Sequence, residues 1–237
     1  MLKAISLYLG AIGKISYYKL WNLFLIIVVL LLFTFFMVFG GVYILGDYLG
    51  DFLSSYIEYA NYQQYIGVAL EWGVRFILWF IAFISYKYIM LILLSPIFSL
   101  VSSKVESTLN GGVTSPFTFV DELIRALKFN VRNIWKELIF TAICLVLGFF
   151  PLINLVVPLL LFIMQSYFLG MGIMDYYMER HFTIDEAVSY VKQNKFFVTG
   201  VGACFILTML IPIIGWVFAP ILATIACTEY GCSTRNS

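Results

Sequence analysis

The segment Ile139–Tyr177 has the sequence IFTAICLVLGFFPLINLVVPLLLFIMQSYFLGMGIMDYY. It is apolar almost throughout, but Phe150–Asn154 interrupts it near its middle with a proline and an asparagine. Because proline ends or kinks a helix, the segment predicts two helical arms joined by a turn, which we call a broken hairpin. Arms this apolar are typical of a membrane protein.

The same design recurs toward the C-terminus, over residues 196–228. This second apolar segment is broken at Ile211–Gly215, and in both copies a proline lies in the break and another follows it. The C-terminal half is therefore interpreted as a two-fold internal repeat. The residues predicted to form the hairpin turns are Pro151, Asn154 and Pro158 in the first copy and Pro212, Gly215 and Pro220 in the second.

Composition assigns the class of protein independently of any motif. Of the 237 residues, 62% are hydrophobic and 11% are charged, and the mean hydropathy is +0.98. Such a chain is not solvated as one globule, so we expect an integral membrane protein. The four cysteines lack metal-ligand spacing, no glycine-rich phosphate loop follows a strand, and the basic residues are spread among short loops instead of forming one stripe with interleaved aromatic residues. We therefore expect no metal, no cofactor and no nucleic-acid partner.

The N-terminal part of the chain predicts a membrane span and its orientation. Residues 1–19 predict an interfacial helix, and residues 20–45 contain no charge over 26 residues. A helix of that length measures about 39 Å, more than the roughly 30 Å of a hydrocarbon core, so it spans. Residues 46–64 hold acids but no Lys or Arg, whereas residues 1–19 hold three lysines. By the positive-inside rule, residues 46–64 form an extracytoplasmic loop and the N-terminus is cytoplasmic.

A second long transmembrane helix is expected over residues 65–109. Glu71 and Arg75 are four residues apart, a spacing that favours an ion pair near the outer interface. The dipeptide Ser95-Pro96 is expected to interrupt this helix near its cytoplasmic end. Gly111 suits the left-handed conformation with which helices commonly end.

Residues 118–137 predict an amphipathic helix with acids in its first turn. Four basic residues follow, the later three at offsets of 3, 7 and 11 from the first, which places them within roughly an 80° arc. This basic stripe consists of Arg125, Lys128, Arg132 and Lys136. It either contacts anionic lipid head groups or forms an electropositive vestibule that concentrates an anion at a pore mouth.

The two hairpins, residues 138–177 and 196–229, have basic residues outside their ends and none at their tips, which places their outer ends and the C-terminus in the cytoplasm. The first arm has only 12 apolar residues, about 20 Å, so the hairpins are predicted to enter the membrane partway. Their tips then hold helix N-termini that suit an anion, or merely form tight turns. Asp175, at the inner end of the first hairpin, is expected to accept hydrogen bonds from Arg125 or Arg132.

The polar segment 178–195 contains the single histidine of the chain, His181, among several acids. One histidine with scattered acids is weak evidence for a metal site, so this segment is predicted to be a solvated loop. Within it, Thr183 precedes two acids, a pattern that predicts an N-cap and a short amphipathic helix through Val191.

Several short motifs occur in order between Tyr86 and Glu229. They are Ser95-Pro96-Ile97-Phe98, Glu106 ahead of Leu109-Asn110-Gly111, Phe150-Pro151, Met174-Asp175-Tyr176 and Leu210-Ile211-Pro212. In these motifs and their order the chain resembles the CysZ-type sulfate permease family, which shares its domain with the etoposide-induced endoplasmic-reticulum proteins of eukaryotes.

The resemblance implies an all-α integral membrane protein with two long transmembrane helices and two proline-broken, partly penetrating helical hairpins. It also implies a homo-oligomer in the bacterial inner membrane and passive sulfate uptake that supports cysteine biosynthesis. One glutamate of the family is retained as Glu106, and Ser103 replaces another. Where the family often has a Gly-Leu-Arg-Arg anion-binding turn, this chain has Tyr17-Tyr18-Lys19-Leu20-Trp21, with one basic residue.

Two classes of function remain. The first is a permease for sulfate or a similar small anion; the second is a membrane structural or adaptor protein that transports no solute. An enzyme is not expected, because no Ser/His/Asp set, paired carboxylates or metal-ligand group lies at membrane depth. The residues predicted to bind the anion or line its pathway are Lys19, Glu106, Arg125, Lys128, Arg132 and Asp175.

Overall fold

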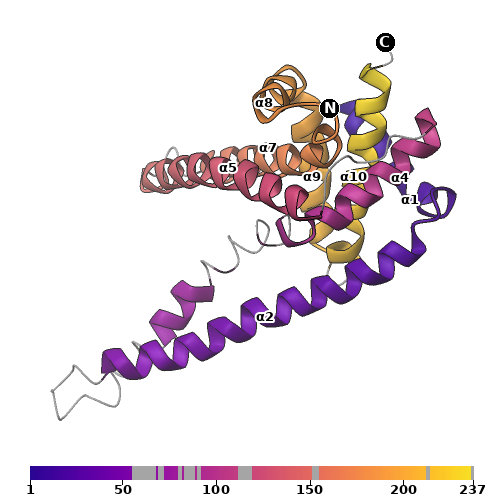
Figure 1. Cartoon of the computed structure of the whole chain (residues 1–237). Coiled ribbons are helices and arrows are strands. Elements are labelled where there is room, and N and C mark those ends of the chain that lie inside the picture. The colour runs from indigo at the N-terminus through magenta and orange to yellow at the C-terminus, as the bar shows by residue number, and fades with distance from the viewer. Residues whose placement is uncertain are drawn as a thin grey trace. The chain divides into compact units, whose positions relative to one another are not determined.

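The computed structural model describes residues 1–54, 68, 72–79, 82, 89, 92–111, 119–150, 155–211 and 214–235. The regular elements within these ranges are α-helices (Figure 1). Three of them are long and apolar enough to cross a membrane, namely Trp21–Phe52, Val157–Met178 and Ile214–Arg235. The predicted class is confirmed: the chain is an all-α membrane protein.

The chain forms two compact units, one of Met1–Val28 with Leu91–Ser237 and one of Val29–Met90. The helices that begin in the first unit are α1 (Leu2–Tyr17), α2 (Trp21–Ser54), α4 (Ser95–Asn110), α5 (Phe119–Leu147), α7 (Val157–Met178), α8 (Ile184–Gln193), α9 (Lys195–Met209) and α10 (Ile214–Arg235).

The Val29–Met90 unit corrects one predicted boundary. Helix α2 does not end near Leu45 but continues to Ser54, so the predicted extracytoplasmic loop 46–64 begins as helix. Asp47 and Asp51 are one helical turn apart, so these acids mark the end of the apolar run without ending the helix. The rest of that loop lies outside the described residues.

Arg75 of the same unit forms an ion pair with Asp47 of α2. Its guanidinium also lies 5.3 Å from the ring centroid of Tyr43, a cation–π contact. Glu71, the predicted partner of Arg75, is outside the part of the chain that the structure describes. Arg75 thus links residues 72–79 to α2 by an ion pair and a cation–π contact.

Helices α7 and α9 cross at very short range in the first unit. A Cβ atom added to Gly202 of α9 would lie 1.8 Å from the carbonyl oxygen of Ser166, and one added to Gly170 of α7 would lie 2.1 Å from that of Val198. Contacts this short admit only glycine at both positions. Small residues let membrane helices approach closely, and here they form the centre of the first unit.

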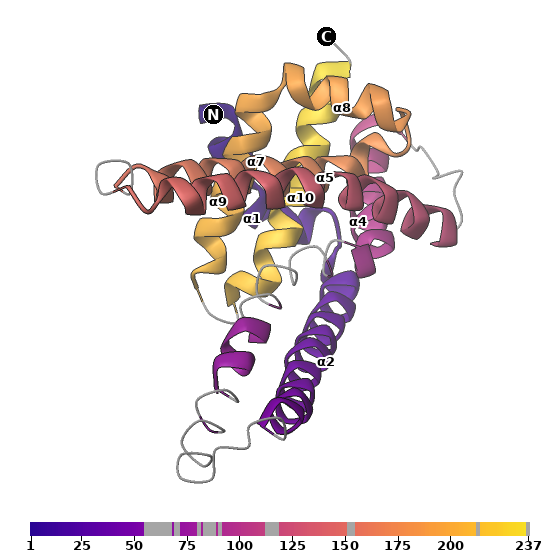
Figure 2. The same cartoon turned by 90° about the vertical axis from the view of Figure 1, so that its left-hand side faces the viewer.

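Helix α5 corrects a second predicted boundary. The basic helix predicted at residues 118–137 and the first arm of the hairpin at 138–177 are one continuous helix of 29 residues. No proline or glycine occurs within α5, so the change from polar to apolar sequence does not break the helix. Helices α5 and α7 lie side by side and run across the direction of α9 and α10 in two perpendicular views (Figure 1, Figure 2).

The second hairpin, formed by α9 and α10, turns tightly. A Cβ atom on Gly215 would lie 1.9 Å from the carbonyl oxygen of Thr208, so glycine allows the arms to meet. The indole N–H of Trp216 donates to the carbonyl of Met209 over 3.2 Å, satisfying one carbonyl at the end of α9. Gly215 therefore lies in the first turn of α10, next to the break between the two helices.

Pro220 does not lie at a turn, contrary to the prediction, but inside α10. A proline removes one helical hydrogen bond, and membrane helices tolerate this loss where neighbouring groups satisfy the backbone. Pro158 falls in the first turn of α7, where a proline costs no hydrogen bond. Pro151, Asn154 and Pro212 are outside the described residues.

Two predicted helix ends are confirmed. Gly111 ends α4 with φ 78°, in the left-handed region, and its N–H donates to the carbonyl of Ser107. Thr183 caps α8, because its hydroxyl accepts from the Glu186 N–H while the Glu186 carboxylate accepts from the Thr183 N–H over 2.8 Å. This reciprocal arrangement is a capping box.

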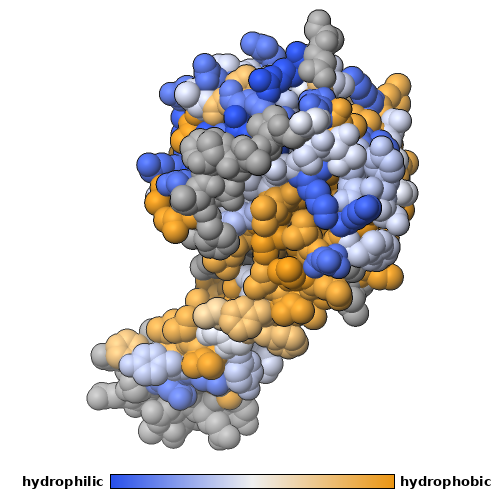
Figure 3. Space-filling model, turned by 45° about the vertical axis from the view of Figure 1, so that its right-hand side comes forward, coloured by the Kyte–Doolittle hydropathy of each residue, from blue (hydrophilic) through white to orange (hydrophobic). Residues whose placement is uncertain are grey.

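The hairpin arms differ in length. Helices α7 and α10 each have 22 residues and α9 has 15, which correspond to about 33 Å and 22 Å. The first arm belongs to the 29-residue α5 in one copy of the repeat and is the 15-residue α9 in the other, so the two copies are unequal. Partial penetration of the membrane stays a prediction. On the face drawn in Figure 3, hydrophilic residues gather over the upper end of the first unit and an apolar patch lies below them.

Candidate functional site

Charged side chains that the fold buries gather beside the C-terminal end of α7. We call them the buried charge network: Glu106 of α4, Arg125 of α5, Asp175 of α7, and Glu179, Arg180 and His181 of the turn after α7. The four elements come from distant parts of the sequence. Burial of so many charges inside a membrane protein marks a structural or functional centre.

Arg180 is at the centre of this network, with its side chain 0% exposed. Its Nε donates to Glu106 Oε2 over 3.0 Å, and its Nη2 donates to the Ser102 hydroxyl over 2.6 Å. Its Nη1 donates to the carbonyl of Tyr176 over 2.8 Å, which satisfies a carbonyl at the end of α7. The negative end of the α7 dipole further favours a cation at this position.

His181 corrects the prediction of a solvated loop, because its side chain is only 6% exposed. Its Nε2 lies 2.6 Å from Glu106 Oε1, and its Nδ1 lies 2.5 Å from Arg235 Nη1. Since a guanidinium only donates, Nδ1 accepts and the proton is on Nε2, from which it is donated to Glu106. The turn between α7 and α8 is short, so His181 stays close to the helix ends and packs against α4 and α10.

Arg125 and Asp175 meet, as the sequence predicts. The guanidinium Nη2 of Arg125 donates to Asp175 Oδ1 over 3.0 Å, and its Nη1 donates to the carbonyl of Phe182 over 2.9 Å. The Asp175 side chain is 4% exposed and that of Arg125 is 14% exposed. The pair therefore links α5, α7 and the turn that leads to α8. Because both side chains are largely shielded from water, each charge is stabilised by its partner.

The basic stripe of α5 does not present four equivalent charges. Arg125 belongs to the buried charge network, whereas Arg132 lies at the surface and pairs with Asp185 of α8 over 3.0 Å. Lys128 and Lys136 are exposed. The stripe therefore combines one buried arginine, one surface ion pair and two exposed lysines.

The predicted anion turn around Lys19 joins α1 to α2. Lys19 has φ 52°, an uncommon left-handed conformation for a residue with a side chain, and its carbonyl accepts from the Lys104 ammonium over 2.7 Å. Next to it, the Lys14 ammonium and the Tyr18 hydroxyl both donate to the Glu229 carboxylate of α10, each over 2.7 Å. Burial, together with the hydrogen bond and charge of Glu229, raises the pKa of Tyr18.

A hollow of about 500 Å³ lies beside this turn. Lys3, Lys14, Asn110 and Glu229 are among its polar lining residues. Sequence reasoning does not select Lys14 or Glu229, because they are 215 residues apart and neither lies in a motif. The structure brings together Lys14, Tyr18 and the Glu229 carboxylate at the turn that contains Lys19.

Helix α5 buries three polar residues on one face, while several of its large apolar residues point outward. Asn130 and Asn133 are each 2% exposed and Glu137 is 3% exposed, and their spacing of 3 and 4 residues places them on one face. We call these three residues the polar interior face. The large apolar residues of α5 that point outward include Leu127, Val131, Trp135, Leu138 and Ile139.

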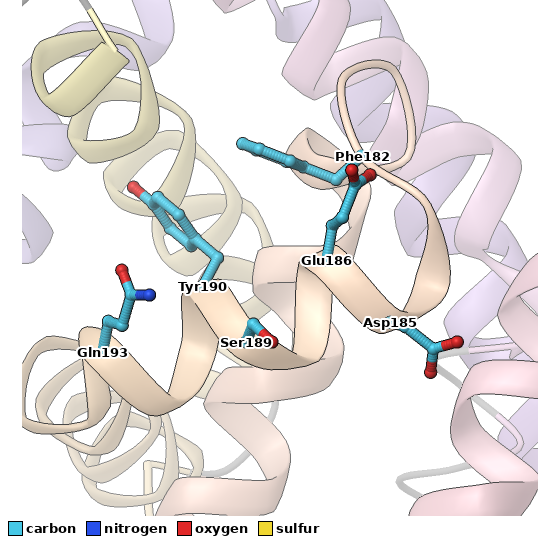
Figure 4. Close-up of a pocket in the computed structure, with 6 residues that line it drawn as sticks. All are labelled: Phe182, Asp185, Glu186, Ser189, Tyr190 and Gln193. Carbon is cyan, nitrogen blue, oxygen red and sulfur yellow. The ribbon is translucent and has the colours of Figure 1, made fainter.

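A pocket of about 440 Å³ lies along α8 (Figure 4). Its lining residues are Phe182, Asp185, Glu186, Ser189, Tyr190 and Gln193. Hydrogen bonds from the backbone N–H and hydroxyl of Thr183 lower the pKa of Glu186, so its carboxylate stays charged. Two carboxylates and no basic residue line this pocket, which makes it unfavourable for an anion.

Comparison with known families identifies one match. The family model described as "Sulfate transporter CysZ/Etoposide-induced protein 2.4" matches residues 8–220. This range includes the α1–α2 turn, the first hairpin, the start of the second hairpin and every member of the buried charge network. No curated protein matches the chain.

Proposed function

The chain belongs to the sulfate transporter CysZ/etoposide-induced protein 2.4 family, and on that premise we propose that it is a permease for sulfate or a similar small inorganic anion. We place it in the inner membrane of a bacterium, where it supplies sulfate for assimilation and cysteine biosynthesis. Both termini are proposed to face the cytoplasm, in keeping with the predicted distribution of charge.

The observation that carries this proposal is the polar interior face of α5. Helices of soluble proteins rarely bury several polar side chains while they expose large apolar ones, whereas α5 buries Asn130, Asn133 and Glu137 and has Leu138 and Ile139 exposed. Buried polar residues in membrane helices are costly and commonly mark a solute pathway. The buried Nδ2 of Asn133 has no hydrogen-bond partner in the described part of the chain, so it is a donor available to an oxyanion.

The exposed charges of α5 supply the approach to this face. Lys128 and Lys136 attract anions and raise their local concentration, with a strength that falls as ionic strength rises. The N-terminus of α7 favours a site where the anion exchanges its water for backbone N–H groups. The N-cap residue, Val156, makes no side-chain hydrogen bond, so these N–H groups are left for an anion. Lys19, near the hollow beside Lys14, contributes a further anion contact.

The buried charge network has a different proposed role from the exposed lysines. Glu106 and Asp175 are occupied by Arg180, His181 and Arg125 at hydrogen-bond distance. Such contacts hold α4, α5 and α7 in register, so the network positions the pathway. We propose that, in a homo-oligomer, a second copy of the chain covers the outward apolar residues of α5.

The test is uptake of radiolabelled sulfate by liposomes that contain the purified chain. We expect saturable uptake that unlabelled sulfate competes away, and a lower rate at subsaturating sulfate when Lys128 and Lys136 are both changed to Gln. A matched variant, Asp185→Asn, changes a surface charge without removing a lysine and should leave uptake at the wild-type rate or above it. Absence of saturable uptake by a folded, reconstituted chain would contradict a permease and favour a structural or adaptor protein.

A further inference from the structure

An apolar groove of about 630 Å³ lies in the first unit, apart from the buried charge network. Ile163, Met164 and Tyr167 of α7 line it together with Phe196 of α9. Ile163 is 43% exposed and Phe196 is 67% exposed, so large apolar side chains face the outside here. The groove therefore offers a surface for an apolar body.

Two lysines give this groove a positive end. Lys192 is in the last turn of α8 and Lys195 is the first residue of α9, so both come from the junction of these helices. The ammonium of Lys195 lies 5.4 Å from the ring centroid of Phe196. No acidic residue lines the groove, and within the described ranges neither lysine forms an ion pair.

Three cations elsewhere in the first unit are already neutralised. Lys14 is held by Glu229, Arg125 by Asp175 and Arg180 by Glu106. Lys192 and Lys195 differ from these three because, within the described ranges, they form no ion pair and line an apolar groove. A groove with apolar walls and two available cations at one end fits a ligand with an apolar tail and an anionic head.

We propose that this groove binds an anionic glycerophospholipid. An acyl chain lies against Ile163, Met164 and Phe196, and the phosphate lies at Lys192 and Lys195. A free inorganic anion would use the lysines and leave the apolar walls uncovered, whereas a zwitterionic lipid would fill the groove without a net charge for the lysines. Charge complementarity therefore selects the anionic lipid.

Tyr167 suits the boundary between the two parts of such a ligand. Its ring lies edge-on to Phe168, with a centroid distance of 5.6 Å, and its hydroxyl supplies a polar tip at the groove. Tyrosine is enriched at membrane interfaces because one end of its side chain is apolar and the other is polar. We assign to Tyr167 the contact with the glycerol ester region.

The experiment compares phosphatidylglycerol with phosphatidylcholine of the same acyl chains, added to the purified full-length chain in detergent. Native mass spectrometry counts the bound lipids. We expect wild type to prefer phosphatidylglycerol and the Lys192→Gln/Lys195→Gln variant to lose that preference by roughly 30-fold, which corresponds to about 1 kcal/mol per lysine. The matched control, Lys128→Gln/Lys136→Gln, removes the same charge from α5 and should keep the preference.

A second variant tests the apolar walls without changing charge. Thr199→Trp fills the groove from α9 and should reduce binding of both lipids, provided that its melting temperature matches wild type. Equal losses in the two lysine pairs would overturn the proposal, since they would report only the overall surface charge. Displacement of phosphatidylglycerol by millimolar inorganic phosphate would overturn it in favour of a free-anion site. A two-chain species that Thr199→Trp abolishes would overturn it in favour of a second copy as occupant.

Discussion

Replacement of Arg180 with Gln should destabilise the chain strongly. The variant loses the guanidinium contacts to Glu106, Ser102 and the Tyr176 carbonyl, at 3.0, 2.6 and 2.8 Å. It also leaves Glu106, 1% exposed, without its arginine. Removing one partner of a buried ion pair costs about 3–5 kcal/mol, because the remaining charge is neither solvated nor compensated.

The assay is thermal unfolding in detergent, followed with a fluorophore that reacts with thiols. Cys227 is 1% exposed and becomes accessible on unfolding, so the native chain contains its own reporter. For a chain of 237 residues, 1 kcal/mol shifts the melting temperature by about 2–4 °C. We therefore expect the Arg180→Gln variant to melt roughly 6–20 °C below wild type.

The double variant Glu106→Gln/Arg180→Gln separates an unpaired charge from a simple loss of packing. It removes both charges, keeps an amide acceptor for His181 and should recover a large part of the lost stability, as pairs in contact are not additive. Two results would refute the reasoning: an Arg180→Gln variant that melts with wild type, or a double variant that melts below both single variants.

Two further predictions concern the helix crossing and the α8 cap. The Gly202→Ala variant should lose about 1–3 kcal/mol of its free energy of unfolding, because the added Cβ lies 1.8 Å from the Ser166 carbonyl oxygen. The control Gly10→Ala, whose Cβ has no atom within 4 Å, should be neutral or stabilising. Equal melting temperatures for the two variants would contradict this expectation. The pKa of Glu186 is below its usual value of about 4.3, so the cap it forms with Thr183 is stabilising above that pH and weakens as pH falls through the lower folded value. The Thr183 amide resonance should follow this titration in wild type and stay constant in Glu186→Gln; the same titration in both chains would show that another group causes it.

Local sequence patterns predict much of the fold. The capping residues Gly111 and Thr183 and the contact between Arg125 and Asp175 follow from spacing and residue type. Each depends on interactions within a few residues or on the pairing of opposite charges at the same end of two helices. Such interactions can be inferred from residue type and spacing in the sequence.

Tertiary contacts explain what the sequence did not predict. Pro220 signals a break, but packing around α10 keeps the helix continuous through it. His181 is polar and lies between two helices, a pattern typical of solvent, yet Glu106 and Arg235 enclose it from segments 75 and 54 residues away. The polar interior face of α5 was not predicted, because the basic residues on the other side of the same helix give the stronger signal.

The central claim is that the polar interior face of α5 borders an aqueous anion pathway, and cysteine accessibility tests it most directly. In a chain whose native cysteines are replaced by alanine, Asn133→Cys and Leu138→Cys are exposed in liposomes to a charged, water-soluble thiol reagent. We expect that Asn133→Cys is modified, that sulfate slows its modification, and that Leu138→Cys, on the apolar outer face, is not modified. An inert Asn133→Cys beside a reactive Leu138→Cys would contradict it.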